Sequence, residues 1–272
     1  MLWNKVIGAG GQGGEPVGAW DISTFTYSGV AFDVTSQTTS FESIFFKPDG
    51  LKMYLVSRSG DIVYEYNLGT AWDITTLSYL QLLDVTAQDG NPQGIFFKPD
   101  GLKLYLTGDD NNSIYEYTLS TAWDVTTATY VQSLDVTAQD SRPQGLFFRS
   151  DGLKMYTTGR SNDAIYEYTL STAWDVTTAT YVGSFTDVNR NSDPYSVFFK
   201  PDGTVMYILL DGATAMRQYT LSTAWDISTA TSDSSMFIYD FGNVVGLFFN
   251  PDGLSLYIAN EGAGDIQLYA SV

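Results

Sequence analysis

Hydrophobic and polar residues alternate along this chain in short runs, and each run ends at a cluster of turn-forming residues. Residues 93–136 show the whole pattern, which predicts strands at about 93–98, 102–108, 114–119 and 129–136. Pro99-Asp100-Gly101 forms the first turn, because proline presets φ and glycine accepts the positive φ that closes a hairpin. Asp109-Asp110-Asn111-Asn112 forms the second turn. No segment has a convincing helical period, so the pattern predicts an all-β chain.

This pattern occurs five times, with a period of about 51 residues. One marker is the tripeptide Ala-Trp-Asp, with its tryptophan at Trp20, Trp72, Trp123, Trp174 and Trp225. The other is a Phe-Phe pair that precedes an Asp-Gly turn and begins at Phe45, Phe96, Phe147, Phe198 and Phe248. Self-similarity at a fixed period indicates a repeat architecture.

Four short strands in a repeat of this length are typical of one blade of a propeller. We therefore predict a five-bladed β-propeller of four-stranded blades over residues 19–272. An additional fourth strand, at about Thr24–Val34, precedes the first Phe-Phe pair, and Val272 follows the third strand of the last repeat. The N-terminal strand is therefore expected to complete the last blade and close the ring.

Residues 1–18 lie outside the repeat. Their glycine-rich part, residues 8–14, is typical of a flexible linker. Before it, four apolar residues form what we call the apolar hook: Leu2, Trp3, Val6 and Ile7. The segment is expected to be either a disordered tail or an arm that anchors the ring to a partner. Its pattern is not that of a secretory signal peptide.

The amino-acid composition excludes several kinds of partner and catalytic group. With 31 acidic and 13 basic residues, the net charge is −18, which disfavours binding to nucleic acid or to an anionic membrane surface. No apolar run approaches the length of a membrane-spanning helix. The chain has no cysteine and no histidine, which excludes disulfides, thiolate chemistry, Ser-His-Asp nucleophiles and the usual zinc sites. We expect no cofactor and no enzymatic activity.

Two repeated features have both structural and functional interpretations. Each tryptophan is expected to wedge between blades while its aspartate caps the next turn; the alternative is five aromatic platforms for sugar rings. The Tyr-Glu-Tyr triplets place a glutamate at equivalent positions in three repeats, where the last two repeats are expected to have glutamine. Those residues are Glu65, Glu116, Glu167, Gln218 and Gln267. Because an amide replaces the carboxylate, we expect a cross-strand pair or a solvent-facing side chain, with no acid–base role.

The connections between the second and third strands, and those that lead into the next blade, differ between copies and should lie on one face. Binding residues favour loops on a rigid scaffold, so we predict a ligand-binding face there, while loops that drift without a function are the alternative. The candidate residues are Asn91, Asp109, Asp110, Asn111, Asn112, Arg142, Arg160, Asn189, Arg190 and Tyr195. The cluster at residues 109–112 could offer oxygen ligands to calcium, but its spacing is not that of an EF-hand and it suits ordinary turn chemistry, so we expect no metal.

The segment Phe45–Tyr54, Phe-Phe-Lys-Pro-Asp-Gly-Leu-Lys-Met-Tyr, followed by Ile-Val-Tyr-Glu-Tyr at residues 62–66, resembles the YVTN and surface-protein class of β-propeller repeats. The resemblance covers all five repeats. Such repeats occur in bacterial surface proteins and in structural proteins of bacteriophage particles. Five blades are also similar to the tachylectin-type lectin, whose blades each hold a sugar, but no lectin motif matches residue by residue.

These observations together favour a non-enzymatic display or recognition protein on a virion surface: a bacteriophage decoration, head-fibre or tail-associated protein. Its partners would be other virion structural proteins, bound through the arm, and a cell-surface glycan or protein, bound through the variable face. An extracellular or cell-surface location is the alternative setting. A purely architectural protein is the second hypothesis. The third is a five-bladed glycoside hydrolase, which would need two carboxyl groups a few ångströms apart; outside the triplets the glutamates are Glu15, Glu42 and Glu261.

Overall fold

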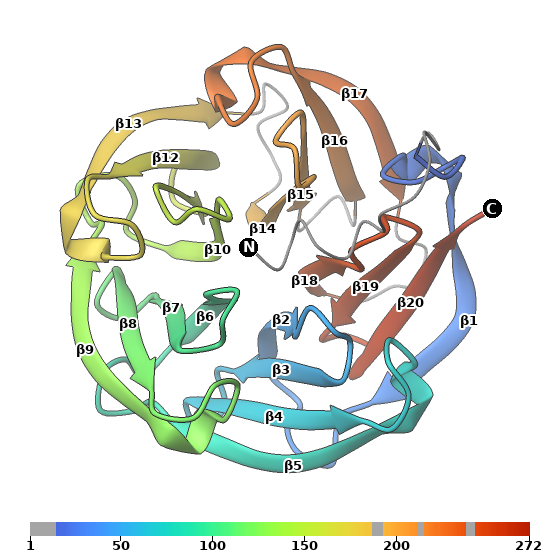
Figure 1. Cartoon of the computed structure of the whole chain (residues 1–272), viewed down its shortest axis with the longest axis horizontal. Helices are drawn as coiled ribbons and strands as arrows, with labels where there is room; N and C mark the ends of the chain where they lie inside the picture. Colours follow the sequence, from blue (N-terminus) through green and yellow to red (C-terminus); the bar gives the residue numbers. More distant parts are fainter. Residues whose placement is uncertain (1–14, 187–192, 211–214, 238–242) are drawn as a thin grey trace.

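The structure is a computed structural model that describes residues 15–186, 193–210, 215–237 and 243–272, without the side chains of 235–237. Five four-stranded antiparallel sheets surround a central axis as the blades of a propeller (Figure 1). The first blade comprises β2 (Phe41–Phe46), β3 (Lys52–Ser57), β4 (Ile62–Leu68) and β5 (Leu77–Asp84), and the second β6 (Pro92–Phe97), β7 (Lys103–Gly108), β8 (Ser113–Leu119) and β9 (Ala128–Asp135). The third comprises β10 (Pro143–Phe148), β11 (Lys154–Gly159), β12 (Ala164–Leu170) and β13 (Ala179–Thr186), and the fourth β14 (Pro194–Phe199), β15 (Val205–Leu210), β16 (Ala215–Leu221) and β17 (Ala230–Phe237).

The fifth blade joins the two ends of the chain. It comprises β18 (Val244–Phe249), β19 (Ser255–Asn260), β20 (Asp265–Ser271) and, from the N-terminal side, β1 (Phe25–Asp33). The register of β1 against β20 runs from Phe25 opposite Ser271 to Asp33 opposite Asp265. The predicted five-bladed ring, closed by the N-terminal strand, is therefore confirmed.

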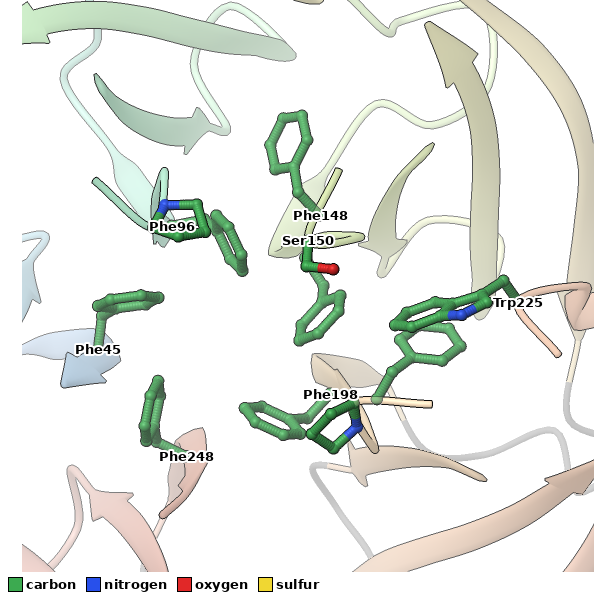
Figure 2. A pocket seen from close by; sticks show the side chains of 11 residues that line it. Phe45, Phe96, Phe148, Ser150, Phe198, Trp225 and Phe248 are labelled. Carbon is green, nitrogen blue, oxygen red and sulfur yellow. The ribbon is translucent and has the colours of Figure 1, made fainter. Parts of the chain in front are cut away.

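Phenyl rings fill the axis of the propeller, as Figure 2 shows for Phe45, Phe96, Phe198 and Phe248. They belong to the first phenylalanine of each Phe-Phe pair: Phe45, Phe96, Phe147, Phe198 and Phe248. Each ring contacts both of its neighbours edge-on, with centroid separations between 5.1 and 5.6 Å. Edge-to-face aromatic pairs contribute about 0.5–1.5 kcal/mol each beyond the area they bury. We call this closed circle the phenylalanine plug.

The tryptophans wedge between blades, as the structural interpretation predicts. The ring of Trp123 stacks on Phe45 of the preceding blade at 6.4 Å, and its carbonyl accepts a 2.7 Å hydrogen bond from the Tyr54 hydroxyl of that blade. Within its own blade the indole of Trp123 covers Gly101, where an added Cβ would clash with the indole ring. Asp124 caps the single 3-10 turn that follows, and Asp21, Asp73, Asp175 and Asp226 do the same in the other blades.

The turns divide the molecule into two faces. The Pro-Asp-Gly type hairpins and the tryptophan loops lie together on one side, as in the 3.0 Å hydrogen bond from the Trp123 amide to the Gly101 carbonyl; this is the repetitive face. On the opposite side, the variable face, the second turn of a blade contacts the connection into the next blade, as in the 2.9 Å bond from the Val136 amide to Asn112 O.

The chain enters the ring on the repetitive face. There Glu15 Oε1 lies 2.7 Å from Lys200 Nζ, in the first hairpin of the fourth blade. The apolar hook (Leu2, Trp3, Val6 and Ile7) lies outside the described residues. Within the described part of the chain, no helix has the length and apolarity needed to cross a membrane.

Candidate functional site

Charged side chains gather where the axis opens on the variable face. The residue that directly follows the second strand is Arg58, Asp109, Arg160 and Glu261 in the first, second, third and fifth blades. The charges of all four of these side chains affect the pKa of Glu42, which lies near the start of β2. We call these five residues the axial cluster. Its alternating signs come from four different blades, so only closure of the ring brings them together.

One guanidinium joins two carboxylates in this cluster. Arg58 Nη1 lies 3.1 Å from Glu42 Oε1, and its Nη2 lies 2.9 Å from Glu261 Oε1. Asn243 donates to the other oxygen of Glu261 at 2.7 Å. From the sequence we singled out Glu42 and Glu261 only as glutamates outside the Tyr-Glu-Tyr triplets, and we did not predict that a single arginine would link them.

Glu42 is 4% exposed. Burial raises its pKa to about 7, with Arg58 opposing the shift and Glu261 adding to it. A carboxyl group with this pKa exchanges its proton near neutrality.

Three of the predicted site residues meet at Asp109. Asn91 Nδ2 donates to Asp109 Oδ2 at 3.2 Å, and Arg142 Nε approaches the same oxygen to 3.6 Å. Burial raises the pKa of Asp109, while Arg142 opposes the shift. The side chain of Arg142 is 47% exposed, so it remains available to a ligand on this face.

Two more predicted residues, Arg160 and Tyr195, meet between the third and fourth blades. Arg160 donates from Nε and Nη2 to Asp193 Oδ2, at 2.9 and 2.7 Å, and its guanidinium lies 4.3 Å from the centroid of Tyr195. We predicted Tyr195 as a loop residue, but it lies in β14 and is only 6% exposed. Its ring therefore supports Arg160 through a cation–π contact.

Residues 109–112 form a turn around a buried carboxylate. Asp89, 3% exposed, accepts hydrogen bonds from the amides of Asp110 (3.3 Å) and Asn111 (3.1 Å) and from the Tyr115 hydroxyl (2.9 Å). Asn112 has a φ of 49°, as the turn requires. Sequence reasoning missed Asp89 and its equivalent Asp140, although both follow glutamine at the same repeat position. Nowhere in the described residues do three or more Asp, Glu, Cys or His side chains gather to hold a metal ion.

Of the remaining predicted residues, Asn189 and Arg190 lie outside the described part of the chain. Sequence reasoning missed Arg58 and Asp193. For Arg58, the available signal was the charge that follows the second strand of a blade and changes sign from copy to copy.

The axis below the cluster has no room for a ligand. The space between the phenylalanine plug and the variable face has a volume of about 20 Å³, and the depression on the repetitive side, lined by Ser150 and Trp225, has about 40 Å³ (Figure 2). Such volumes hold one to a few water molecules. A ligand of the axial cluster would therefore lie across the mouth and would not enter a channel.

The repeated glutamates are buried at the seams between blades, so the solvent-facing alternative is wrong and the cross-strand pair is confirmed. Glu65, Glu116 and Glu167 are at most 3% exposed and pair with Lys52, Lys103 and Lys154. Each also accepts a backbone N–H from the next blade, such as that of Val125 to Glu65 Oε2 at 3.1 Å.

One of the predicted equivalents is wrong. Gln218 pairs with Tyr207 as Glu65 pairs with Tyr54, which confirms its equivalence. In the fifth blade, however, Leu268 is opposite Tyr257, while Gln267 is opposite Ile258. The position of Glu65 is therefore occupied by Leu268. The prediction matched Gln267 to the glutamates because of its similar chemistry, and this placed the fifth repeat one residue out of register.

No family model matches the chain, and no curated protein matches it in sequence. Among solved structures it is similar to the β-propeller domain of Cps50 (Swd1) from Myceliophteria thermophila, with a TM-score of 0.51 at 10% identity over 91% of this chain and 99% of that one. A protein from Lactobacillus plantarum gives 0.55 at 16% identity over 84% and 67%. A candidate 6-phosphogluconolactonase from Bacteroides uniformis gives 0.53 at 14% identity over 82% and 64%, so this chain spans less than two thirds of that protein. At these identities the likeness shows the β-propeller fold alone.

Proposed function

We propose that this chain is a non-enzymatic recognition protein on a virion surface, as a bacteriophage decoration, head-fibre or tail-associated protein. The N-terminal arm would bind other virion structural proteins. The axial cluster and the loops around it would bind a cell-surface glycan or protein. The virion setting rests on the resemblance of the repeats to those of bacteriophage structural proteins.

The observation that carries this proposal is the place of Glu15. It pairs with Lys200 on the repetitive face, opposite the axial cluster. An arm that leaves from this face would hold the ring with its variable face turned away from the anchor. Several rings on one particle would then combine weak single contacts into avid binding.

The chemistry of the variable face suits a polar ligand. Arg58 and Arg142 are 46% and 47% exposed and offer guanidinium donors, while Glu261 and Asp109 offer acceptors beside them. Charge-assisted hydrogen bonds of this kind recognise hydroxyl, amide and carboxylate groups. Because the phenylalanine plug fills the axis, recognition would take place at the surface of the mouth.

A glycan array tests the proposal, using the full-length chain, a variant without residues 1–14, and two matched arginine variants. Arg142→Ala removes a donor from the variable face, and Arg149→Ala removes one that pairs with Asp151 on the repetitive face. We expect both chain lengths to bind. Of the two arginine variants, only Arg142→Ala should weaken binding, by about tenfold, because it removes one charge-assisted hydrogen bond. An array that stays silent with an avid multimer would favour the purely architectural hypothesis.

A specific observation favours a second candidate function, that of a glycoside hydrolase. Glu42 and Glu261 contact the same guanidinium, and the pKa of Glu42 is raised to about 7, as a general acid requires. Incubating each bound glycan with the protein tests this candidate. Cleavage that Glu42→Gln abolishes, with binding retained, would replace the non-enzymatic proposal.

A further inference from the structure

A glutamine completes the seam in each of the first two blades. Gln81 Nε2 donates to Glu65 Oε2 and to Asp124 Oδ1 of the next blade, both at 2.8 Å. In the second blade, Gln132 Nε2 makes the same two contacts, with Glu116 at 2.9 Å and Asp175 at 2.8 Å. One nitrogen thus bridges two carboxylates that belong to adjacent blades.

The third blade lacks this glutamine. Gly183 is opposite Glu167, where Gln132 is opposite Glu116 in the second blade. A Cβ built on Gly183 would meet no atom within 4 Å. In place of the missing side chain, a cleft of about 340 Å³ opens at the seam, lined by Lys154, Glu167, Thr169, Val182, Asp226 and Ser228. We call it the Gly183 cleft.

The two acceptors of the glutamine amide are still present there. Glu167 is 3% exposed and accepts the Ile227 amide at 3.3 Å, as its counterparts accept theirs. Asp226 Oδ1 accepts the amide and hydroxyl of Ser228, at 3.0 and 2.6 Å. With Lys154 the three charged side chains carry a net charge of −1, since one positive charge faces two negative charges. A cationic nitrogen donor is therefore the best electrostatic match to the position that glutamine fills elsewhere.

We propose that the Gly183 cleft binds a primary ammonium group carried by a small hydroxylated ligand, of the class of an amino sugar. The ammonium nitrogen takes the place of the glutamine Nε2 and donates to Glu167 Oε2 and Asp226 Oδ1. The hydroxyl groups of Thr169 and Ser228 face the remainder of the ligand. A volume of about 340 Å³ lies within the range of small-molecule sites. The cleft lies at a seam beside a tryptophan loop, so this site is independent of the variable face.

Calorimetric or NMR titration of the full-length chain with glucosamine, against glucose as the matched neutral probe, tests the proposal. Gly183→Gln copies the first two blades into the third, and Gln132→Gly opens the equivalent cleft in the second. We expect glucosamine to bind at least about tenfold more tightly than glucose, the effect of one charge-assisted hydrogen bond. Gly183→Gln should weaken glucosamine binding at least about tenfold, and Gln132→Gly should raise the stoichiometry from one site to two.

Three results would contradict binding of an ammonium group in the Gly183 cleft. Equal binding of the two sugars, glucosamine binding that Gly183→Gln leaves unchanged, or no saturable binding would each overturn the proposal. Gly183 has no positive φ and its added side chain meets open space, so Gly183→Gln should fold, and a thermal melt checks this. If Gln132→Gly does not fold, the comparison of Gly183→Gln with the parent chain decides alone.

Discussion

Replacing Glu42 by glutamine should make the protein more stable above pH 7 and leave its stability almost unchanged at pH 4. The pKa of Glu42 is raised from 4.5 to about 7 by burial, and the side chain is 4% exposed. As pH rises past 4.5, the unfolded chain loses this proton before the folded chain does. The folded state is therefore progressively disfavoured up to about pH 7, and above it the penalty is complete.

The size of the effect follows from the shift. The rise from 4.5 to about 7 corresponds to about 3.5 kcal/mol of stability, at about 1.4 kcal/mol per pKa unit, and a small part of this is already present at pH 4. Glutamine does not titrate. The free energy of unfolding of Glu42→Gln, minus that of the parent chain, should thus rise by about 3 kcal/mol between pH 4 and pH 8.

Urea denaturation of both proteins at pH 4, 5, 6, 7 and 8 measures this difference. Glu15→Gln removes an exposed carboxylate on the opposite face and controls for the change in net charge. A flat difference curve would refute the reasoning. A variant that becomes less stable than the parent as pH rises would show that the ion pair with Arg58 outweighs burial.

Three further predictions concern the scaffold, each measured as the free energy of unfolding in urea. Phe147→Ala should cost about 3–5 kcal/mol because it breaks the phenylalanine plug, whereas the exposed Tyr181→Ala should cost far less. Lys103→Val should cost about 3–5 kcal/mol by leaving Glu116 buried without its cation, and adding Glu116→Gln should restore most of that loss. Gly101→Ala should destabilise more than Gly60→Ala: both have positive φ, but only Gly101 lies under an indole.

The fold could be predicted from the sequence because the repeat supplies five independent copies of the same evidence. The turns at Pro99-Asp100-Gly101 and at residues 109–112 lie where turn chemistry predicts them. Ring closure was also predictable, since a fourth strand precedes the first repeat and the last repeat lacks one. The register of one strand, β20, could not be predicted, because Leu268 occupies the position of Glu65 there. Ser255 occupies the position of Lys52 in that blade, so no cation is present and an apolar residue suits the glutamate position.

The candidate site could be predicted only in part. Asn91, Asp109 and Arg142 lie on adjacent connections of one face, so topology alone placed them near one another. Glu42 and Glu261 are at opposite ends of the chain, and only the closed ring places both on Arg58. The pKa of Glu42 depends on burial at the axis, which the alternation of residues in β2 does not reveal.

Differences among the blades separate structural residues from candidates for function. Where Lys52 becomes Val205, Glu65 becomes Gln218, and where it becomes Ser255, the glutamate position becomes leucine, so each seam loses both charges together. This joint loss is what a buried ion pair requires, because either partner alone would be a buried unpaired charge. The third blade keeps both charges, Lys154 and Glu167, but has Gly183 where the first two blades have the glutamine that bridges the glutamate to the aspartate of the next blade. This change removes only the bridging amide and leaves open space between Glu167 and Asp226, which is the position that the proposed ammonium group would occupy.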